Sequence, residues 1–194
     1  MNSIKHLHNQ ICGSFYCLIF CLSLGLTMTA ATAHQTHDSN ITETDVLAAQ
    51  QGWCQALLNI AALHEESGQT AAAELAGAVI DTAYGYAIGP VLFKPTLAHG
   101  ERTVRTTREG ALSYFVGGDD HFPEDSGFAL KGWNDCQVEN AAIHINGDVG
   151  LSMGFVHFFN NDGQTTVDKT WGFKKTDDGA VRIVLHHSSL PFSP

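Results

Sequence analysis

The feature that most constrains the fold is a regular series of turn signals in the C-terminal third of the chain. Three short polar sequences separate runs of strand-forming residues: Asn146-Gly147-Asp148, Asn161-Asp162-Gly163 and Asp177-Asp178-Gly179. Asn-Gly and Asp-Gly pairs adopt the positive φ angles that tight hairpins need. The sequence therefore predicts consecutive antiparallel strands at about 128–145, 149–160, 164–175 and 180–188.

Alternation within two of these strands predicts which side chains share a face of the sheet. In the strand at 149–160, large apolar residues recur at every second position and are interrupted by His157, whereas the opposite face carries glycine and serine. In the last strand Leu185 and His187 share one face, and His186 lies on the other. We expect the small residues to leave room for a closely packed partner, and a histidine to end each apolar row.

The N-terminal half of the chain predicts helices. Thr42 and Asp45 form a capping pair, and a wide apolar face that includes Trp53 follows them. Ser67-Gly68 ends this first helix, and glycine and proline break the alanine-rich segment after it. The predicted elements are helices over about 42–66, 70–84 and 106–116 and a short strand over 91–93.

Residues 1–33 have the composition of an export signal. Lys5 precedes an uncharged run over 11–30, and Ala31-Thr32-Ala33 is a small-x-small cleavage pattern. An uncleaved membrane anchor is the alternative, because the uncharged run approaches the length of a membrane span. We favour cleavage, and thus a periplasmic or secreted protein with this organisation: a signal peptide at 1–33, a disordered tail at 34–41 and one domain at 42–194.

The charge of the chain limits its partners. The formal net charge is −10 at pH 7, and removal of the signal takes away one further positive charge, that of Lys5. An acidic protein is repelled by nucleic acid and by anionic membrane surfaces. We therefore expect no nucleic-acid partner, and no membrane association after the signal is cleaved.

Two cysteines, Cys54 and Cys136, remain after the signal, at apolar positions of a predicted helix and a predicted strand. An oxidising compartment permits a disulfide between them. Two buried thiols are the alternative, because free cysteine is often fully buried. The sequence leaves both open, since it does not give the separation of the Cα atoms.

The order of the predicted elements resembles that of the NTF2-like (cystatin-like cone) fold, an α+β architecture with N-terminal helices packed on a curved antiparallel sheet. Residues 182–191 resemble the closing strand of SnoaL-like proteins and of the association (hub) domain of calcium/calmodulin-dependent protein kinase II. Residues 89–95 and 108–118 resemble an exported bacterial branch of this superfamily. The resemblance implies self-association, as a dimer or a larger ring through the outer sheet face, and a pocket between sheet and helices.

The resemblance also implies candidate ligand-binding residues. Hub-domain pockets contain a basic residue on the strand before the last, to which Lys169 corresponds, and His187 lies where the family has a histidine. Ser188 stands where the hub domain has arginine, so a guanidinium fork for binding an anion is missing. Three aromatic residues are further candidates, although residues at such spacings more often belong to the core: Trp53, Tyr114 and Trp171.

Histidines supply the candidate acid/base chemistry, because imidazole titrates near neutral pH. His187 or His157 could form an acid/base pair with Asp168, although we favour hydrogen-bonded histidines that close the core. Adjacent strand residues point to opposite faces, so His186-His187 does not favour a metal site. The acidic segment 119–127 lacks the ligand spacing of a calcium loop and is predicted to be solvated. We expect no metal and no cofactor.

The sequence therefore favours an exported homo-oligomeric domain that binds an unknown small molecule without catalysis. A cofactor-free lyase, isomerase or cyclase of SnoaL type, with a His/Asp pair, is the first alternative. A structural association module is the second. Some proteins of the exported branch are labelled phosphoribosyl-AMP cyclohydrolase, but two cysteines far apart do not form the cysteine-based zinc site of that enzyme.

Overall fold

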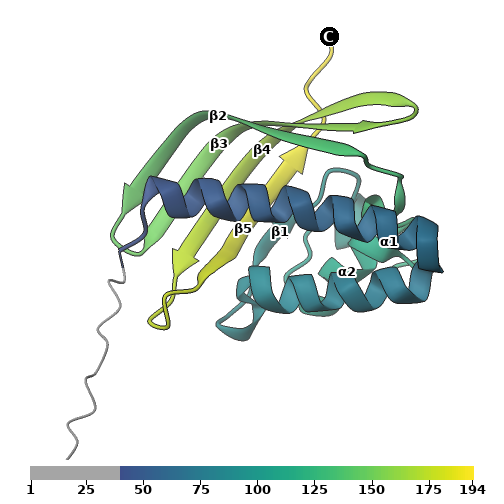
Figure 1. Ribbon diagram of the computed structural model, residues 1–194, viewed down its shortest axis with the longest axis horizontal. Helices are drawn as coiled ribbons and strands as arrows, with labels where there is room; N and C mark the ends of the chain where they lie inside the picture. Colours follow the sequence, from purple (N-terminus) through teal and green to yellow (C-terminus); the bar gives the residue numbers. More distant parts are fainter. Residues whose placement is uncertain (1–39) are drawn as a thin grey trace, which may run out of the picture. The chain divides into compact units, whose positions relative to one another are not determined.

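The computed structural model describes residues 40–194, so the predicted export signal and nearly all of the predicted tail lie outside the described residues. Within 40–194, helices cover one face of a curved five-stranded sheet (Figure 1). The helices and strands are α1 (Glu43–Ala83), β1 (Leu92–Lys94), α2 (Arg108–Val116), β2 (Asp135–Asn146), β3 (Val149–Asn160), β4 (Gly163–Lys175) and β5 (Val181–Ser189). This arrangement confirms the predicted α+β fold class and the NTF2-like cone. None of the described helices is both long and apolar enough to cross a membrane.

The sheet order is β1-β5-β4-β3-β2. Strands β2 to β5 form the predicted antiparallel meander, with the predicted turns between them. The short strand β1 pairs in parallel with β5 and so brings the segment that follows the helices beside the end of the chain. The meander begins later than predicted, because residues 128–130 form a 3₁₀ turn and Gly132 (φ 66°) interrupts the extended backbone.

Helix α1 consists of two helical halves joined at Gly68, whose φ of 82° and ψ of −179° are non-helical. Only glycine adopts such an angle without steric cost, so the predicted break after Ser67 is confirmed. The first half crosses the strands and the second returns beside it (Figure 1). The predicted capping pair is also present: Asp45 N donates to Thr42 Oγ1, and Thr42 N donates to Asp45 Oδ2.

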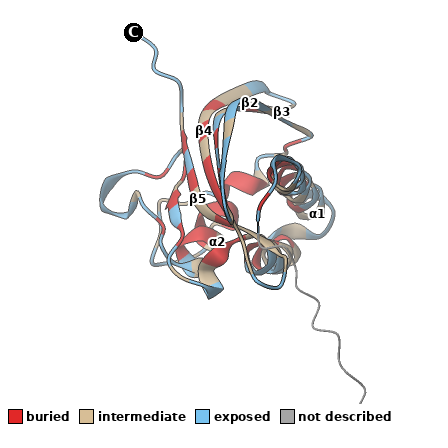
Figure 2. Cartoon of the chain, turned by 90° about the vertical axis from the view of Figure 1, so that its left-hand side faces the viewer, coloured by how far each residue is buried: buried red, intermediate tan, exposed pale blue. Residues whose placement is uncertain are grey.

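The small residues of β3 let α1 approach the sheet closely, as the alternation predicted. A Cβ atom added to Gly150 would lie 2.7 Å from Cγ2 of Val46 on α1. Beside this contact, the Gln50 amide donates to Ser152 Oγ and to Asn140 Oδ1, at 2.9 Å each, so its buried nitrogen is satisfied. Figure 2 shows that the buried residues gather on this inner side of the sheet and on α2.

A disulfide joins Cys54 on α1 to Cys136 on β2, with the Cα atoms 5.5 Å apart. That separation lies within the range that a disulfide can bridge. The bond fastens the first half of α1 to the edge strand β2, two elements that are far apart in the sequence.

Candidate active site

A β-bulge in β5 decides which side chains of the last strand face inward. Gly172 pairs with Leu185, but Phe173 pairs with Ile183, so Val184 is an extra residue without a partner. A bulge shifts the alternation by one position. His186 therefore turns inward and is 2% exposed, whereas the next residue, His187, is exposed on the outer face. The face predicted for His187 from simple alternation is wrong for this reason.

Four buried polar side chains form a hydrogen-bonded chain beneath α1. Lys169 Nζ on β4 contacts Nε2 of His186 on β5. Nδ1 of His186 is 2.8 Å from the hydroxyl of Tyr84, which follows α1. The indole nitrogen of Trp53 on α1 donates to the same hydroxyl at 2.9 Å. We call these four residues the buried polar chain, because each of them is at most 5% exposed.

The surroundings of Lys169 are aromatic rather than anionic. Its Nζ lies 4.7 Å from the ring centroid of Trp53 and 4.6 Å from that of Trp171. Burial lowers the pKa of Lys169 well below its usual value, because a charged amine loses its hydration there. Burial, reinforced by Lys169, also lowers the pKa of His186, and burial raises the pKa of Tyr84. All three shifts favour the neutral side chains.

Three hydroxyl groups meet at the end of the buried polar chain. Ser188 lies opposite Lys169 in the register of β4 and β5 and is therefore its neighbour on the inner face. Oγ of Ser188 is 2.7 Å from Oγ1 of Thr96, in the loop after β1. The hydroxyl of Tyr114 on α2 accepts from Leu97 N at 3.4 Å. Burial raises the pKa of Tyr114, and hydrogen bonds from Leu97 and Thr96 oppose that shift. We call Thr96, Tyr114 and Ser188 the hydroxyl cluster.

Aromatic side chains fill most of the space around the buried polar chain, so the two cavities near it are small. One, of about 10 Å³, lies between the two halves of α1 and is bordered by Trp53 and Tyr84. Another, of about 20 Å³, borders the hydroxyl cluster at Tyr114 and is lined also by Leu97, Phe128 and residues 124–126. The second cavity has room for one water molecule beside polar groups.

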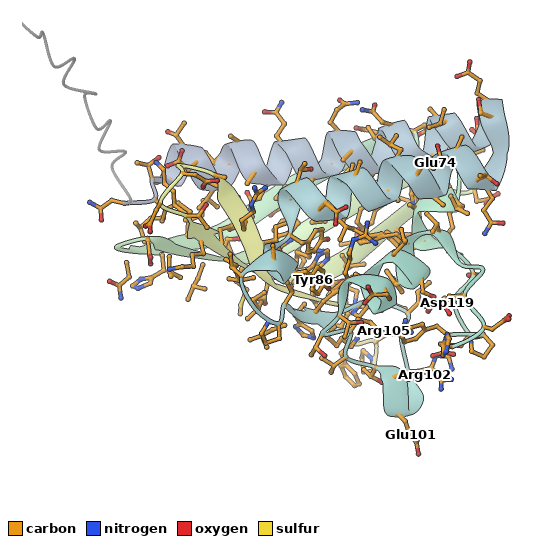
Figure 3. All side chains as sticks on the ribbon, turned by 90° about the horizontal axis from the view of Figure 1, so that it is seen from below. Glu74, Tyr86, Glu101, Arg102, Arg105 and Asp119 are labelled. Carbon is orange, nitrogen blue, oxygen red and sulfur yellow. A yellow bond between two sulfur atoms is a disulfide. The ribbon has the colours of Figure 1, made fainter. Side chains whose placement is uncertain are left out.

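The loop that forms one wall of this second cavity is held by a buried arginine. The guanidinium of Arg105 binds both carboxylate oxygens of Asp125, at 2.6 and 2.9 Å, and its Nε donates to the carbonyl of Arg102 at 2.6 Å. Ser113 donates to the same carboxylate at 2.7 Å. The carbonyl of Arg105 accepts from Tyr86 at 3.1 Å, and Figure 3 labels both residues in a view from below. Asp125, predicted to be solvated, is only 3% exposed at its side chain because of this pairing.

The structure brings four of the residues singled out from the sequence together on the inner side of the sheet. Lys169 lies between the rings of Trp53 and Trp171, whose centroids are 5.8 Å apart, and Tyr114 lies in the same aromatic core. Four residues of the candidate site were not among the predicted site residues. They are His186, Ser188, Tyr84 and Thr96. Simple alternation placed His186 on the wrong face because it does not account for the bulge, and Ser188 was named only as the residue that replaces an arginine. Tyr84 and Thr96 belong to no sequence motif.

The other predicted residues lie on the outer face. His157 there contacts Thr166 and Glu139, at 2.9 and 3.2 Å, and does not close the core. His187 is exposed; burial, followed by Lys94, lowers its pKa, and Asp168 opposes that shift. These residues therefore face away from the hydroxyl cluster. In the part of the chain that the structure describes, no group of three His, Cys, Asp or Glu residues is arranged to hold a metal ion.

Comparison with known proteins gives concordant results. The family model described as "Metal-independent carbonic anhydrase" matches residues 44–190. A relative of that name from Nostoc sp. (strain PCC 7120 / SAG 25.82 / UTEX 2576) is 53% identical over 171 residues, which are 87% of this chain and 83% of the relative.

Two solved structures extend the comparison. The iota-carbonic anhydrase from a cyanobacterium, crystallised with bicarbonate, has a TM-score of 0.80 at 53% identity and covers 81% of this chain and 97% of its own. An NTF2-like protein of unknown function from Shewanella oneidensis MR-1 has a TM-score of 0.44 at 14% identity, with coverages of 75% and 97%.

Proposed function

Because the chain belongs to the metal-independent carbonic anhydrase family, we propose that it catalyses the reversible hydration of carbon dioxide to bicarbonate. The expectation of small-molecule binding without catalysis is thereby corrected, since the 53% identical relative carries the name of an enzyme. The SnoaL-like alternative with a His/Asp pair is not taken further, because His187 and His157 face away from the inner side of the sheet.

We place the reaction at the hydroxyl cluster. The observation that carries this choice is that three hydroxyl groups lie beside a buried lysine and histidine, and that one of them, Tyr114, lines a cavity large enough for one water molecule. Hydroxyl groups both donate and accept hydrogen bonds. They therefore suit bicarbonate, which has one hydroxyl group and two oxygen atoms that share a negative charge.

The chemistry requires groups that act where charge develops. During hydration a water oxygen attacks the carbon atom of carbon dioxide, and negative charge forms on the two original oxygens. Hydrogen bonds from Thr96 and Tyr114 stabilise that charge most effectively inside a site that excludes bulk water, which leaves the hydroxyl of Ser188 for the attacking water. The aromatic residues Phe93 and Phe128, which pack against Tyr114, provide apolar surroundings in which carbon dioxide is accommodated.

Removal of single hydroxyl groups tests this assignment. We expect Thr96→Val and Tyr114→Phe each to lower kcat/KM for carbon dioxide hydration by about 10²-fold, the loss typical for one donor to a developing anion. Ser188→Ala is expected to lower it by about 10²-fold as well, the loss typical for a group that contacts the attacking water. Stopped-flow assays with a pH indicator, on protein dialysed against a chelator, measure the rate.

The matched control is Thr170→Val, which removes a hydroxyl from the outer side of β4. It is expected to retain the wild-type rate. A wild-type rate no faster than the uncatalysed reaction would refute the function, and unchanged rates in all three cluster variants would refute the location.

We further propose that the protein forms a homodimer through the outer sheet face. Three large apolar side chains of β3 are exposed there, with exposed fractions of 42% for Leu151, 61% for Met153 and 39% for Phe155. Adjacent exposed apolar groups on a sheet face are a common basis for association. Light scattering at micromolar concentration is expected to give a dimer mass for the wild type and a monomer mass for Met153→Lys. A monomeric wild type would contradict the proposal.

We also propose that the protein is exported and that residues 1–33 are removed. The supporting observation is the uncharged run followed by the cleavage pattern at 31–33. Mass spectrometry of the protein recovered from a periplasmic or secreted fraction is expected to show His34 as the first residue. Recovery of the full-length chain from membranes would support the anchor alternative instead.

A further inference from the structure

The donors and acceptors of the buried polar chain determine where its protons lie. The indole nitrogen of Trp53 can only donate, so the hydroxyl oxygen of Tyr84 is the acceptor in that contact. The hydroxyl proton of Tyr84 then requires an acceptor. Nδ1 of His186 is the other hydrogen-bonding atom that contacts this hydroxyl among the described residues. Nδ1 of His186 therefore accepts, and the neutral imidazole carries its proton on Nε2.

This assignment fixes the state of Lys169. Nε2–H of His186 points at Nζ of Lys169, so Nζ must accept a hydrogen bond. An ammonium group has three donors and no lone pair, whereas a neutral amine has one. The donors of Trp53, Tyr84 and His186 are all satisfied when Lys169 is a neutral amine. With an ammonium, the hydroxyl proton of Tyr84 or Nε2–H of His186 is left without an acceptor.

The groups around Lys169 agree with a neutral amine. His186 and Tyr84 are the other titratable groups of the buried polar chain. His187 lies on the outer face of β5, and Lys94 lies beside it on the neighbouring strand β1. No carboxylate among residues 40–194 forms an ion pair with Lys169. Its amine lies over the rings of Trp53 and Trp171, and Ser188 is its neighbour in the register of β4 and β5. A buried ammonium without an anion is costly, and two aromatic faces offset only part of that cost.

We propose that Lys169 is the general base of the hydration reaction and receives its proton through Ser188. This role rests on the proposed function. As the water oxygen bonds to carbon, one O–H bond of that water breaks and its proton passes to Oγ of Ser188. Ser188 at the same time gives its own hydroxyl proton to Nζ of Lys169, whose one lone pair turns from Nε2–H of His186 toward Ser188 for this step. The products are bicarbonate and an ammonium group, so atoms and charges balance.

The buried polar chain also explains why Lys169 gives up its proton again. Protonation removes the lone pair of Nζ, so Nε2–H of His186 loses its acceptor and the ammonium becomes a stronger acid. The rings of Trp53 and Trp171 stabilise the charge long enough for the transfer. Tyr84 and His186 are positioning residues, since they hold the tautomer that keeps Nζ an acceptor. In the reverse direction the ammonium gives its proton to the departing hydroxyl of bicarbonate.

A direct test observes the amine itself. Protein labelled with [¹³Cε]-lysine is titrated from pH 6 to pH 10 by NMR, and the Lys169 signal is assigned by its loss in Lys169→Met. We expect this signal to have the shift of a neutral amine at pH 7, because burial lowers the pKa of Lys169 well below its usual value. A Lys169 signal with the shift of an ammonium at pH 7 overturns the proposal, whether or not the protein hydrates carbon dioxide.

Stability against pH provides a second measurement with a defined sign. In the unfolded chain Lys169 binds a proton below its ordinary pKa near 10.5, whereas the folded protein does not. Unfolding therefore takes up a proton in this range, and the folded state becomes more stable as the pH rises. The urea midpoint of the wild type is expected to rise from pH 7 to pH 9.5, and this rise should be smaller in Lys169→Met, in which the lowered pKa of Lys94 still contributes.

Kinetics then test the catalytic role. We expect Lys169→Met to lower kcat by about 10²- to 10⁴-fold, with KM changed less than about threefold and the acid limb of the pH–rate profile lost. Lys131→Met, on an exposed residue, is the matched control and should keep the wild-type profile. If the wild type is active and the kcat of Lys169→Met is within about threefold of the wild-type kcat, Lys169 is not the general base, while the proposed function stands. An inactive wild type overturns the proposed function, and the NMR titration still decides the state of Lys169.

Discussion

Replacement of Arg105 with methionine is expected to lower the free energy of unfolding by about 3–5 kcal/mol. The guanidinium is 1% exposed and binds both oxygens of Asp125, whose side chain is 3% exposed. Without Arg105 that carboxylate stays buried beside Ser113 with no opposite charge, which is the costly outcome when one partner of a buried pair is removed. Urea unfolding followed by tryptophan fluorescence measures the change.

The chain provides a matched control on a neighbouring arginine. Arg108 binds Asp81 in a similar fork, but the two side chains are 36% and 55% exposed. Solvent screens such a pair, so Arg108→Met should cost less than about 1 kcal/mol. Equal losses in the two arginine variants would show that burial of the Arg105–Asp125 pair is not what stabilises the loop. Because that loop lines the cavity at Tyr114, Arg105→Met should also reduce activity, whereas Arg108→Met should not.

Loss of the disulfide is expected to have an effect of similar size. Cys54 and Cys136 are 82 residues apart, and the loop-entropy model gives about 4–5 kcal/mol for closing a loop of that length. A reductant should therefore lower the urea midpoint of the wild type markedly, to a value near that of the Cys54→Ala/Cys136→Ala double variant.

The double variant is also the control, since it has no disulfide to reduce and should not respond to the reductant. Alkylation followed by mass spectrometry counts the free thiols before reduction. A wild type that is fully alkylated without reduction would mean that this disulfide does not form. A wild type that is protected from alkylation, but unfolds at the same urea concentration with and without reductant, would contradict the expected stabilisation.

Local patterns were sufficient to predict most of the secondary structure. The Asn-Gly and Asp-Gly turns, the break at Gly68 and the cap at Thr42 each depend on a few neighbouring residues, and all of them are found in the structure. The alternation in β3 was informative for the same reason, because Gly150 and Ser152 leave room for a closely packed partner as predicted, and that partner is α1.

The parts of the site that could not be predicted depend on contacts between distant segments. The parallel pairing of β1 with β5 joins residues more than 90 positions apart, and it brings Thr96 to Ser188. The partner of Asp125 was not apparent either, since nothing in an acidic loop indicates that Arg105 will be buried against it. Both contacts form only when the whole domain folds.

The proposed activity was not anticipated from the sequence, because the residues proposed to carry it lack a recognisable spacing. Carbon dioxide hydration is often performed by a zinc-bound hydroxide, for which clustered histidines are the signature. Residues 40–194 contain no such cluster. Two hydroxyl-bearing residues, a tyrosine and a lysine are common in any sequence, and only the folded chain brings them to one place.

The unpaired residue of β5 has a consequence for how chains of this kind are compared. Two homologues can both contain two adjacent histidines followed by two serines and still present different atoms to the reaction, if only one of them has the extra residue at Val184. An alignment scores these motifs as identical. Reliable transfer of function between such chains therefore requires the hydrogen-bond register of the last strand, in addition to its amino-acid sequence.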